Sequence, residues 1–243
     1  MSELQAVGRE IWCVDRPRRV AGMQLGQRMT VVRLAGGLWV HAPVEWTASL
    51  GAELGSLGEV RHVVAPSCRR DFPLDGWRAH CRTALFWGAP GLPAVLGKFP
   101  FSGELTSAPH AEWAGGLEQE ILGGLPRWNE VVFLHRPSRS LIVTGLAGNL
   151  VGPLDALTRT LATLNGCAGR FGPSRVYKAG IRDKAAFAAS LRRILAWDFD
   201  RVIVGQGALV EQGGRHALAA AYAWLPDAFP VGGCPSPSED VPS

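Results

Sequence analysis

A chain of 243 residues can form one large domain or two small ones, and a content of 47% hydrophobic and 19% charged residues excludes a disordered protein. The net charge of +4 comes from basic residues, nearly all arginine, that form no dense run, which disfavours nucleic-acid binding. Five cysteines without CxxC spacing indicate neither a zinc knuckle nor a disulfide framework, and no stretch approaches the roughly 20 apolar residues of a membrane span. We therefore expect a cytoplasmic protein that does not contact a membrane.

The first half of the chain is predicted to be rich in strands. Short apolar runs predict strands over residues 10–15, 28–34, 38–41, 60–65 and 84–87. Helices are predicted from Thr47, an N-cap residue, to about Ser56 and again over 76–82. Between residues 91 and 124 proline and glycine are frequent and the periodicity is poor, so no element is predicted there and its part in a binding groove stays open.

Strands and helices alternate in the second half. Strands are predicted over 130–134 and 141–143, with the proline-containing turn 135–140 between them, and over 201–204. Helices are predicted over 154–164, over 184–197 behind an Asp183 cap, and over 214–224. We expect one domain over residues 1–228 and a disordered Pro/Ser/Gly-rich tail over 229–243. Hairpins followed by helical connections favour a two-sheet α/β sandwich over a doubly wound sheet.

Six short motifs occur in order along nearly the whole chain. They are RMTVVRL with GGLWVHAPV (28–44), HVVAP (62–66), EWAG (112–115), EVVFLHRPSRSLIVT (130–144), RFGPSR (170–175) and ILAWDFDRVIV (194–204). In number and order these motifs resemble the metallo-β-lactamase superfamily and, within it, the DUF4336 family of bacterial metal-dependent hydrolases. The resemblance implies an αββα sandwich, complete or truncated, with two mixed sheets flanked by helices.

The positions at which the resemblance implies metal ligands hold other residues in this chain. Where ordinary members have a histidine pair after the Ala-Pro of the second motif, this chain has Arg70 and Asp71; an aspartate is replaced by Gly145 and a histidine by Gln206. Of these four residues only Asp71 is of a type that could bind a metal, whereas a zinc site needs three or four converging donors. We therefore expect a degenerate member with no metal and no cofactor, and metal-dependent hydrolysis is disfavoured.

Five residues near predicted loops are candidates for ligand binding. Arg69 and Arg70 either clamp a carboxylate or are solvated loop charges. Trp46, Trp77 and Trp128 either line a binding surface, as aromatic residues do at interfaces, or pack in the core. The sequence leaves both interpretations open for each of them.

Two histidines and one cysteine complete the set of candidates. His135, beside the hairpin turn, is a tentative binding residue whose other interpretation is a hydrogen bond that holds the turn, and His41 is interpreted mainly as structural. Cys68 follows the Ala-Pro motif next to Arg69, whose charge would lower the pKa of a thiol, but the sequence shows no general base for it.

Three functions remain in competition. The first is an inactive hydrolase homologue that binds an extended peptide against a strand edge or in the vacated cleft, in one version to recruit a precursor peptide to modifying enzymes that make ribosomally synthesised and modified peptides (RiPPs). The second is a metal-independent hydrolase or cyclase that uses Cys68, Asp71 or His135. The third is an inactive partner subunit of an active homologue. Neither the ligand nor the oligomeric state follows from the sequence.

Overall fold

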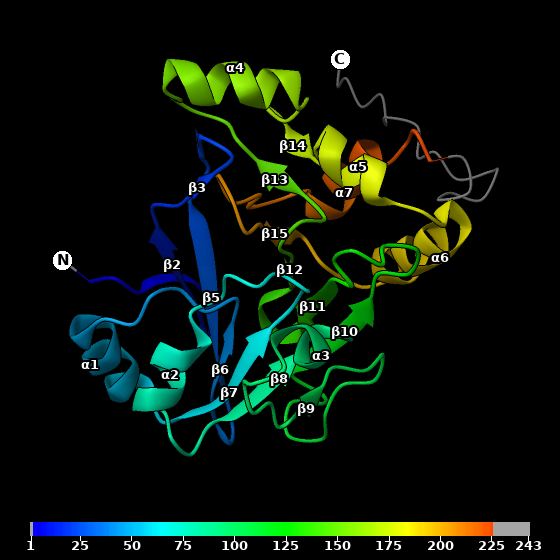
Figure 1. The fold of residues 1–243 in the computed structure, drawn as a ribbon. Coiled ribbons are helices and arrows are strands. Elements are labelled where there is room, and N and C mark those ends of the chain that lie inside the picture. Colours follow the sequence, from blue (N-terminus) through cyan, green and yellow to red (C-terminus); the bar gives the residue numbers. More distant parts are fainter. Residues whose placement is uncertain (1, 226–243) are drawn as a thin grey trace, which may run out of the picture.

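Two sheets packed face to face form the centre of the molecule in the computed structural model, which describes residues 2–225 (Figure 1). The larger sheet has the order β1-β2-β5-β6-β7-β8-β9 and the smaller one the order β10-β11-β12-β15. The strands of the larger sheet are β1 (Gln5–Gly8), β2 (Ile11–Arg16), β5 (Gln27–Leu34), β6 (Gly37–His41), β7 (Val60–Ala65), β8 (Leu85–Gly88) and β9 (Gly103–Glu104). Those of the smaller sheet are β10 (Leu117–Ile121), β11 (Val131–His135), β12 (Ser140–Ile142) and β15 (Arg201–Ile203).

Both sheets are mixed. Strands β1, β2, β5 and β6 are antiparallel neighbours, and β6 to β9 are parallel. In the smaller sheet β10, β11 and β12 are antiparallel, and β12 pairs in parallel with β15. Side chains alternate between the two faces of a strand. On β5, Val32 therefore faces the layer between the sheets, while Met29 and Val31 face the helices outside.

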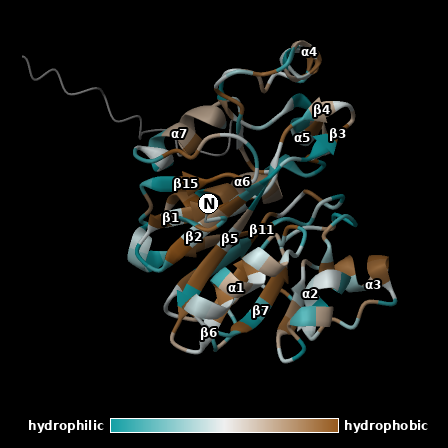
Figure 2. Cartoon of the chain, turned by 90° about the vertical axis from the view of Figure 1, so that its left-hand side faces the viewer, coloured by the Kyte–Doolittle hydropathy of each residue, from teal (hydrophilic) through white to brown (hydrophobic). Residues whose placement is uncertain are grey.

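Helices cover the outer face of each sheet. Helices α1 (Ala48–Leu57), α2 (Leu74–His80) and α3 (Leu92–Leu96) share a hydrophobic core with the larger sheet. Helices α6 (Lys184–Leu195) and α7 (Gly214–Ala221) do the same for the smaller sheet. Figure 2 shows the hydrophobic colour concentrated along the strands in the middle of the molecule. The predicted αββα sandwich is therefore confirmed.

Local signals located most of the regular elements. The Thr47 hydroxyl accepts a hydrogen bond from the Leu50 amide (3.0 Å), and the Asp183 carboxylate accepts one from Ala186 (2.9 Å), as predicted for N-caps. Segment 91–124, for which no element was predicted, contains α3, β9 and β10. The hairpin turn between β11 and β12 is a short 3₁₀ helix, Arg136–Ser138.

A smaller layer lies beyond one end of the sandwich, at the top of Figure 1. It consists of the hairpin β3 (Arg19–Val20) with β4 (Met23–Gln24), the antiparallel pair β13 (Gly148–Asn149) with β14 (Phe171–Gly172), and helices α4 (Ala156–Leu164) and α5 (Arg175–Gly180). The Thr158 hydroxyl on α4 accepts a hydrogen bond from the Gln24 amide (2.8 Å), which joins α4 to the β3–β4 hairpin. The two strand pairs and α5 were not predicted.

Three further expectations concern a membrane span, the C-terminal tail and the number of domains. Within residues 2–225, none of the helices is both long enough and apolar enough to span a bilayer. The tail predicted over 229–243 lies outside the described residues. A single domain over 1–228 stays a prediction.

Candidate functional site

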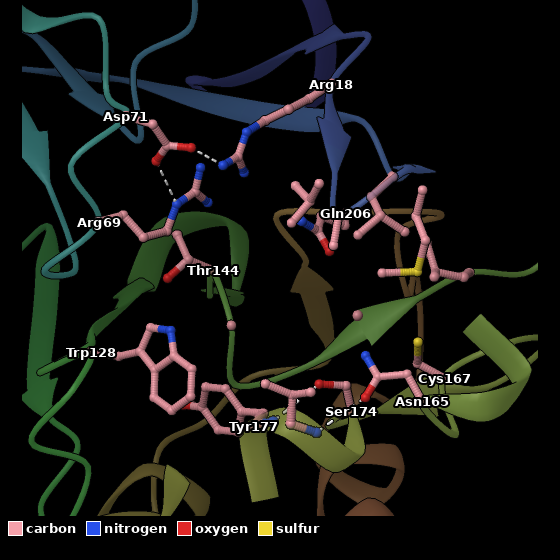
Figure 3. Close-up of a pocket in the computed structure, with 18 of the residues that line it drawn as sticks. Arg18, Arg69, Asp71, Trp128, Thr144, Asn165, Cys167, Ser174, Tyr177 and Gln206 are labelled. Atoms are coloured by element: carbon pink, nitrogen blue, oxygen red, sulfur yellow. Dashed lines mark hydrogen bonds and ion pairs between the residues drawn. The ribbon is translucent and has the colours of Figure 1, made fainter. Parts of the chain in front are cut away.

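A cavity of about 420 Å³ lies where the sandwich meets the smaller layer, and we call it the cleft (Figure 3). Its walls come from the β3–β4 hairpin, the loop after β7, the turn after β12, the connection between α4 and α5, and the turn after β15. Its polar lining consists of Arg18, Arg69, Arg70, Asp71, Thr144, Asn165, Ser174, Tyr177 and Gln206. All four positions at which the resemblance implies metal ligands line this one cleft.

Two arginines hold Asp71 at the cleft. The Arg69 Nε atom lies 3.0 Å from Asp71 Oδ1, and the Arg18 guanidinium pairs with the other carboxylate oxygen. Burial lowers the pKa of Arg69 to about 10, and the nearby charge of Arg18 acts in the same direction. Arg69 Nη2 is buried without a hydrogen-bond partner. Asp71 is the only one of the four residues of a type that binds metal ions, and both of its carboxylate oxygens are paired with guanidinium groups.

The turn after β12 is organised by Glu130, which is buried. One oxygen of its carboxylate accepts hydrogen bonds from the backbone N–H groups of Thr144, Gly145 and Leu146 (2.8, 2.9 and 3.1 Å). The other oxygen accepts a hydrogen bond from the Tyr177 hydroxyl (2.8 Å). Burial and the Glu130 charge raise the pKa of Tyr177, so its phenol stays protonated as a donor. Glu130 therefore stabilises this turn and the position of α5 together.

Tyr177 also occupies the space beside Gly145. A Cβ atom at position 145 would lie 2.9 Å from Cε2 of Tyr177 and 3.1 Å from the Glu130 Oε2 atom. The Tyr177 ring is buried and its hydroxyl is hydrogen-bonded, so it has little freedom to move aside. An aspartate at this position would therefore displace the packed tyrosine.

The turn that carries Gln206 is attached to the larger sheet by Arg28. The Arg28 guanidinium donates to the backbone oxygens of Val204 (3.1 Å) and Gly207 (2.9 Å). Gly207 has a φ of +88°, and a Cβ atom there would lie 2.1 Å from the Asn149 oxygen, so only glycine fits. This turn holds Gln206 at the cleft wall.

The residues of the cleft do not fit a metal ion. A divalent cation needs several nitrogen, sulfur or carboxylate donors, whereas guanidinium groups repel it. No group of three or more His, Cys, Asp or Glu residues able to hold a metal occurs in the part of the chain that the structure describes.

The candidate tryptophans lie in two regions. Trp128 lines the cleft, and its ring centroid is 5.5 Å from that of Tyr177. Trp77 is fully buried under the larger sheet and donates to the Val44 oxygen (2.7 Å), and Trp46 packs edge-on against it (5.0 Å). The structure thus brings Trp128, but neither Trp46 nor Trp77, to Arg69 and Arg70.

Neither candidate histidine is among the residues that line the cleft. His135 is buried at the other end of the smaller sheet, where its Nδ1 atom lies 2.7 Å from the Ser138 hydroxyl and burial lowers its pKa to about 4. His41 is buried and packs against the rings of Trp39 and Phe133, and burial lowers its pKa to about 3. Both environments keep the imidazole neutral.

Cys68 is directed toward a backbone oxygen. Its Sγ atom donates to Pro90 O (3.2 Å), and burial raises the pKa of the thiol. The lowering that the neighbouring Arg69 suggested from the sequence is therefore not found. Such a thiol is a poor nucleophile at neutral pH.

Four residues that organise the cleft were missed by sequence reasoning. Arg18, Thr144 and Tyr177 line it, and Glu130 fixes the turn beside it. Glu130 and Thr144 lie at the two ends of a motif that resembles the family, and a carboxylate at the head of an apolar strand was the available signal. Nothing local in the sequence marked Arg18 or Tyr177.

Solved structures similar to this chain are metallo-β-lactamase-fold proteins, and no curated protein matches the sequence. A metallo-β-lactamase from Erythrobacter litoralis has 13% identity and a TM-score of 0.66, with 93% of this chain and 98% of that chain covered. A metallo-β-lactamase from Pontibacter korlensis has 16% identity and a TM-score of 0.62, with coverages of 92% and 98%. A fragment of diflavin flavoprotein A 5 from Nostoc sp. PCC 7120 has 12% identity and a TM-score of 0.61, with coverages of 91% and 94%.

These similarities show the fold, and the family follows from a separate match. The model of the family described as "Domain of unknown function (DUF4336)" matches residues 8–150, more than half of the chain. This range includes β2 to β13, so it contains three of the four positions at which the resemblance implies metal ligands. The chain therefore belongs to the DUF4336 family and has the metallo-β-lactamase fold.

Proposed function

We propose that this chain is a non-catalytic binding protein that holds a peptide in the cleft. The observation that carries the proposal is the replacement of the implied metal ligands by Arg70, Asp71, Gly145 and Gln206 while the cleft keeps a volume of about 420 Å³. Loss of the ligands removes the means to activate water, whereas a retained cavity still excludes solvent from a ligand. Binding is then the activity that the site supports best.

The lining of the cleft suits a peptide. Amide side chains, Asn165 and Gln206, offer donors and acceptors for a peptide backbone, and the β3–β4 hairpin and Trp128 offer apolar surface. Val176 lines the cleft with 57% of its surface exposed, so apolar contact area continues to the rim. An extended peptide that alternates polar and apolar contacts matches this arrangement.

In its specific form, the proposal is that the protein recruits a precursor peptide to modifying enzymes in RiPP biosynthesis. The modifying enzyme, or a homologous one, is then the second partner. A protein with this role needs affinity and no turnover, which is consistent with a cleft without a metal centre.

A metal-independent enzyme has less support. Asp71 is held by two arginines, the Cys68 thiol has a raised pKa, and His135 lies at the other end of the smaller sheet. These three groups therefore do not converge on one point, as a nucleophile and its base must.

An inactive partner subunit is the second candidate, because α4 exposes two leucines. Leu157 and Leu164 have 57% and 64% of their surface exposed, and such side chains are common in protein contacts. Co-expression with a metal-binding homologue followed by size-exclusion chromatography tests it. A stable complex that Leu157→Ser and Leu164→Ser disrupt would support this candidate, and separate elution would contradict it.

The main proposal is tested by calorimetry against peptides encoded near the gene, with mass spectrometry of the peptide afterwards and elemental analysis of the protein. We expect one peptide bound per chain with micromolar or tighter affinity, the peptide intact, and no stoichiometric metal. Stoichiometric zinc or iron, or cleaved peptide, would contradict the proposal. Arg82 is exposed and lines a separate surface hollow, so Arg82→Gln is the charge-matched control for removing an arginine from the cleft.

A further inference from the structure

The charges that line the cleft do not cancel. Arg18, Arg69 and Arg70 line the cleft together with a single carboxylate, Asp71, so the lining has a surplus of two positive charges. Glu130 does not line the cleft but lies near enough to influence Arg69, and with its charge counted a surplus of one positive charge remains. The cleft therefore attracts an anion.

Two hydrogen-bonding groups at the cleft have no partner. Arg69 Nη2 and Thr144 Oγ1 are both buried and unpaired, and both residues line the cleft. Buried polar groups are normally paired, so these two groups are free to pair with water or with a ligand in the cleft.

Both residues are held in place by contacts on their other side. Arg69 is fixed by Asp71 (3.0 Å) and lies over the Phe72 ring at 5.0 Å. The backbone of Thr144 donates to Glu130 (2.8 Å). A ligand therefore meets donors that are already positioned, which reduces the entropy lost on binding.

An aromatic surface lies close to these donors. Trp128 lines the cleft beside Tyr177, and the Arg127 guanidinium lies over its ring at 5.4 Å. Figure 3 shows Trp128 and Tyr177 below the group of Arg18, Asp71 and Arg69, and Thr144 between them. An anion bound at Arg69 is thus placed next to apolar surface.

We infer that the cleft is a receptor for a carboxylate attached to an apolar or aromatic group, with Arg69 and Thr144 as donors and Trp128 as the apolar wall. A carboxylate presents two oxygens to these two donors, and a guanidinium matches its planar shape. A phosphate presents three oxygens and more charge, for which the cleft has no third free buried donor among the described residues. The inference rests on the proposed function and names the part of the peptide that is recognised.

Small probes separate the sources of a carboxylate. In calorimetric titrations of the full chain, N-acetylphenylalanine supplies a terminal carboxylate, its amide supplies none, and N-acetylaspartate α-amide supplies a side-chain carboxylate. We expect at least one of the two carboxylates to bind at least about tenfold more tightly than the neutral amide, and the tighter of them identifies the source. Equal affinity for the acids and the amide would overturn the inference, as would tighter binding of inorganic phosphate.

Substitutions assign the donors. Arg69→Gln should weaken carboxylate binding by about tenfold or more, and Thr144→Val by about fivefold, while Arg82→Gln leaves it unchanged. Arg69→Lys keeps the charge beside Asp71 and loses the planar fork, so it tests the same contact if the glutamine variant does not fold. Unchanged carboxylate affinity in folded Arg69→Lys and Thr144→Val would overturn the assignment.

The two proposals fail in different ways. Amidated peptides without acidic residues that bind as tightly as free acids would overturn the carboxylate receptor and leave peptide binding intact. Carboxylate probes that bind with the expected dependence on Arg69, combined with no binding of any peptide, would support the receptor and contradict the proposed function.

Discussion

His62, near the start of strand β7, and Arg69, in the loop beyond its other end, differ in how their side-chain nitrogens are paired. At the first end, His62 accepts a hydrogen bond from Trp87 Nε1 (3.3 Å), faces Glu112 through Nε2 (2.8 Å) and packs edge-on against Trp113 (5.0 Å). Beyond the second end, Arg69 keeps one buried nitrogen unpaired at the cleft. Both nitrogens of the histidine are satisfied within the chain, which is what stability requires. The unpaired arginine nitrogen instead remains available to a ligand.

The largest expected effect is at the His62 end, from Trp113→Ala. Trp113 is buried between the sheets and donates to Gln119 (2.9 Å), so its truncation leaves a cavity and an unpaired amide oxygen. We expect a loss of about 3–5 kcal/mol in the free energy of unfolding, measured with urea. The affinity of the folded variant for N-acetylphenylalanine should stay unchanged. A variant of native stability with much weaker binding would contradict the contrast between the two ends.

A smaller loss is expected from Gly145→Asp. The new Cβ atom would lie 2.9 Å from the Tyr177 ring, and overpacking of this kind costs roughly 1–3 kcal/mol. Gly148→Asp is the matched control, because the nearest atom to a Cβ there is the Gln206 oxygen at 3.9 Å. Urea unfolding and zinc analysis of both variants measure the effect. Stoichiometric zinc in Gly145→Asp would show that the cleft is closer to a metal site than its residues indicate.

Stability and carboxylate affinity should depend on pH in different ways. Burial lowers the pKa of His41 to about 3, whereas an unfolded histidine titrates near ~6.5. As the pH falls below ~6.5 the unfolded state binds a proton that the folded state does not, so stability decreases, by roughly 2 kcal/mol for this histidine at about pH 5. Urea unfolding at pH 7.5 and 5 should show a weaker dependence for His41→Gln. Arg69 stays charged over this range, so carboxylate affinity should be constant between about pH 6 and 8; a steep change would point to a titrating group at the cleft.

The smallest effect is expected from Arg70→Gln. Arg70 lines the cleft but is exposed, so solvent screens its attraction for an anion. Calorimetry should show about a twofold loss of carboxylate affinity at low salt and less at high salt. A loss as large as that of Arg69→Gln would mean that the two arginines act together.

Local patterns in the sequence predicted most elements of the fold, whereas the cleft depends on contacts between residues that are distant in the sequence. The caps at Thr47 and Asp183 and the buried strand at 60–65 are local features, which a periodic sequence displays. In segment 91–124, strands of two and five residues among prolines and glycines give no such signal.

The candidate site was predictable in part. The resemblance marked four positions that do meet at one cleft, and Arg69 and Trp128 join them there. Proximity to a loop could not distinguish Trp128 from Trp77, because the sequence does not say which side of a loop faces the core. The hydrogen bond between Tyr177 and Glu130 joins residues 47 positions apart, and no local pattern reports such a contact.

The position of Tyr177 beside Gly145 has a consequence for how such a protein can evolve. A mutation that introduces an aspartate at 145 meets a packed ring, so it lowers stability. Moving the ring first breaks its hydrogen bond to Glu130 and loosens the turn that the carboxylate holds. Each of these two single changes is therefore expected to lower stability, and because the residues are in contact their effects should not be additive. Packing at one glycine thus disfavours an aspartate at this position as long as the tyrosine stays in place.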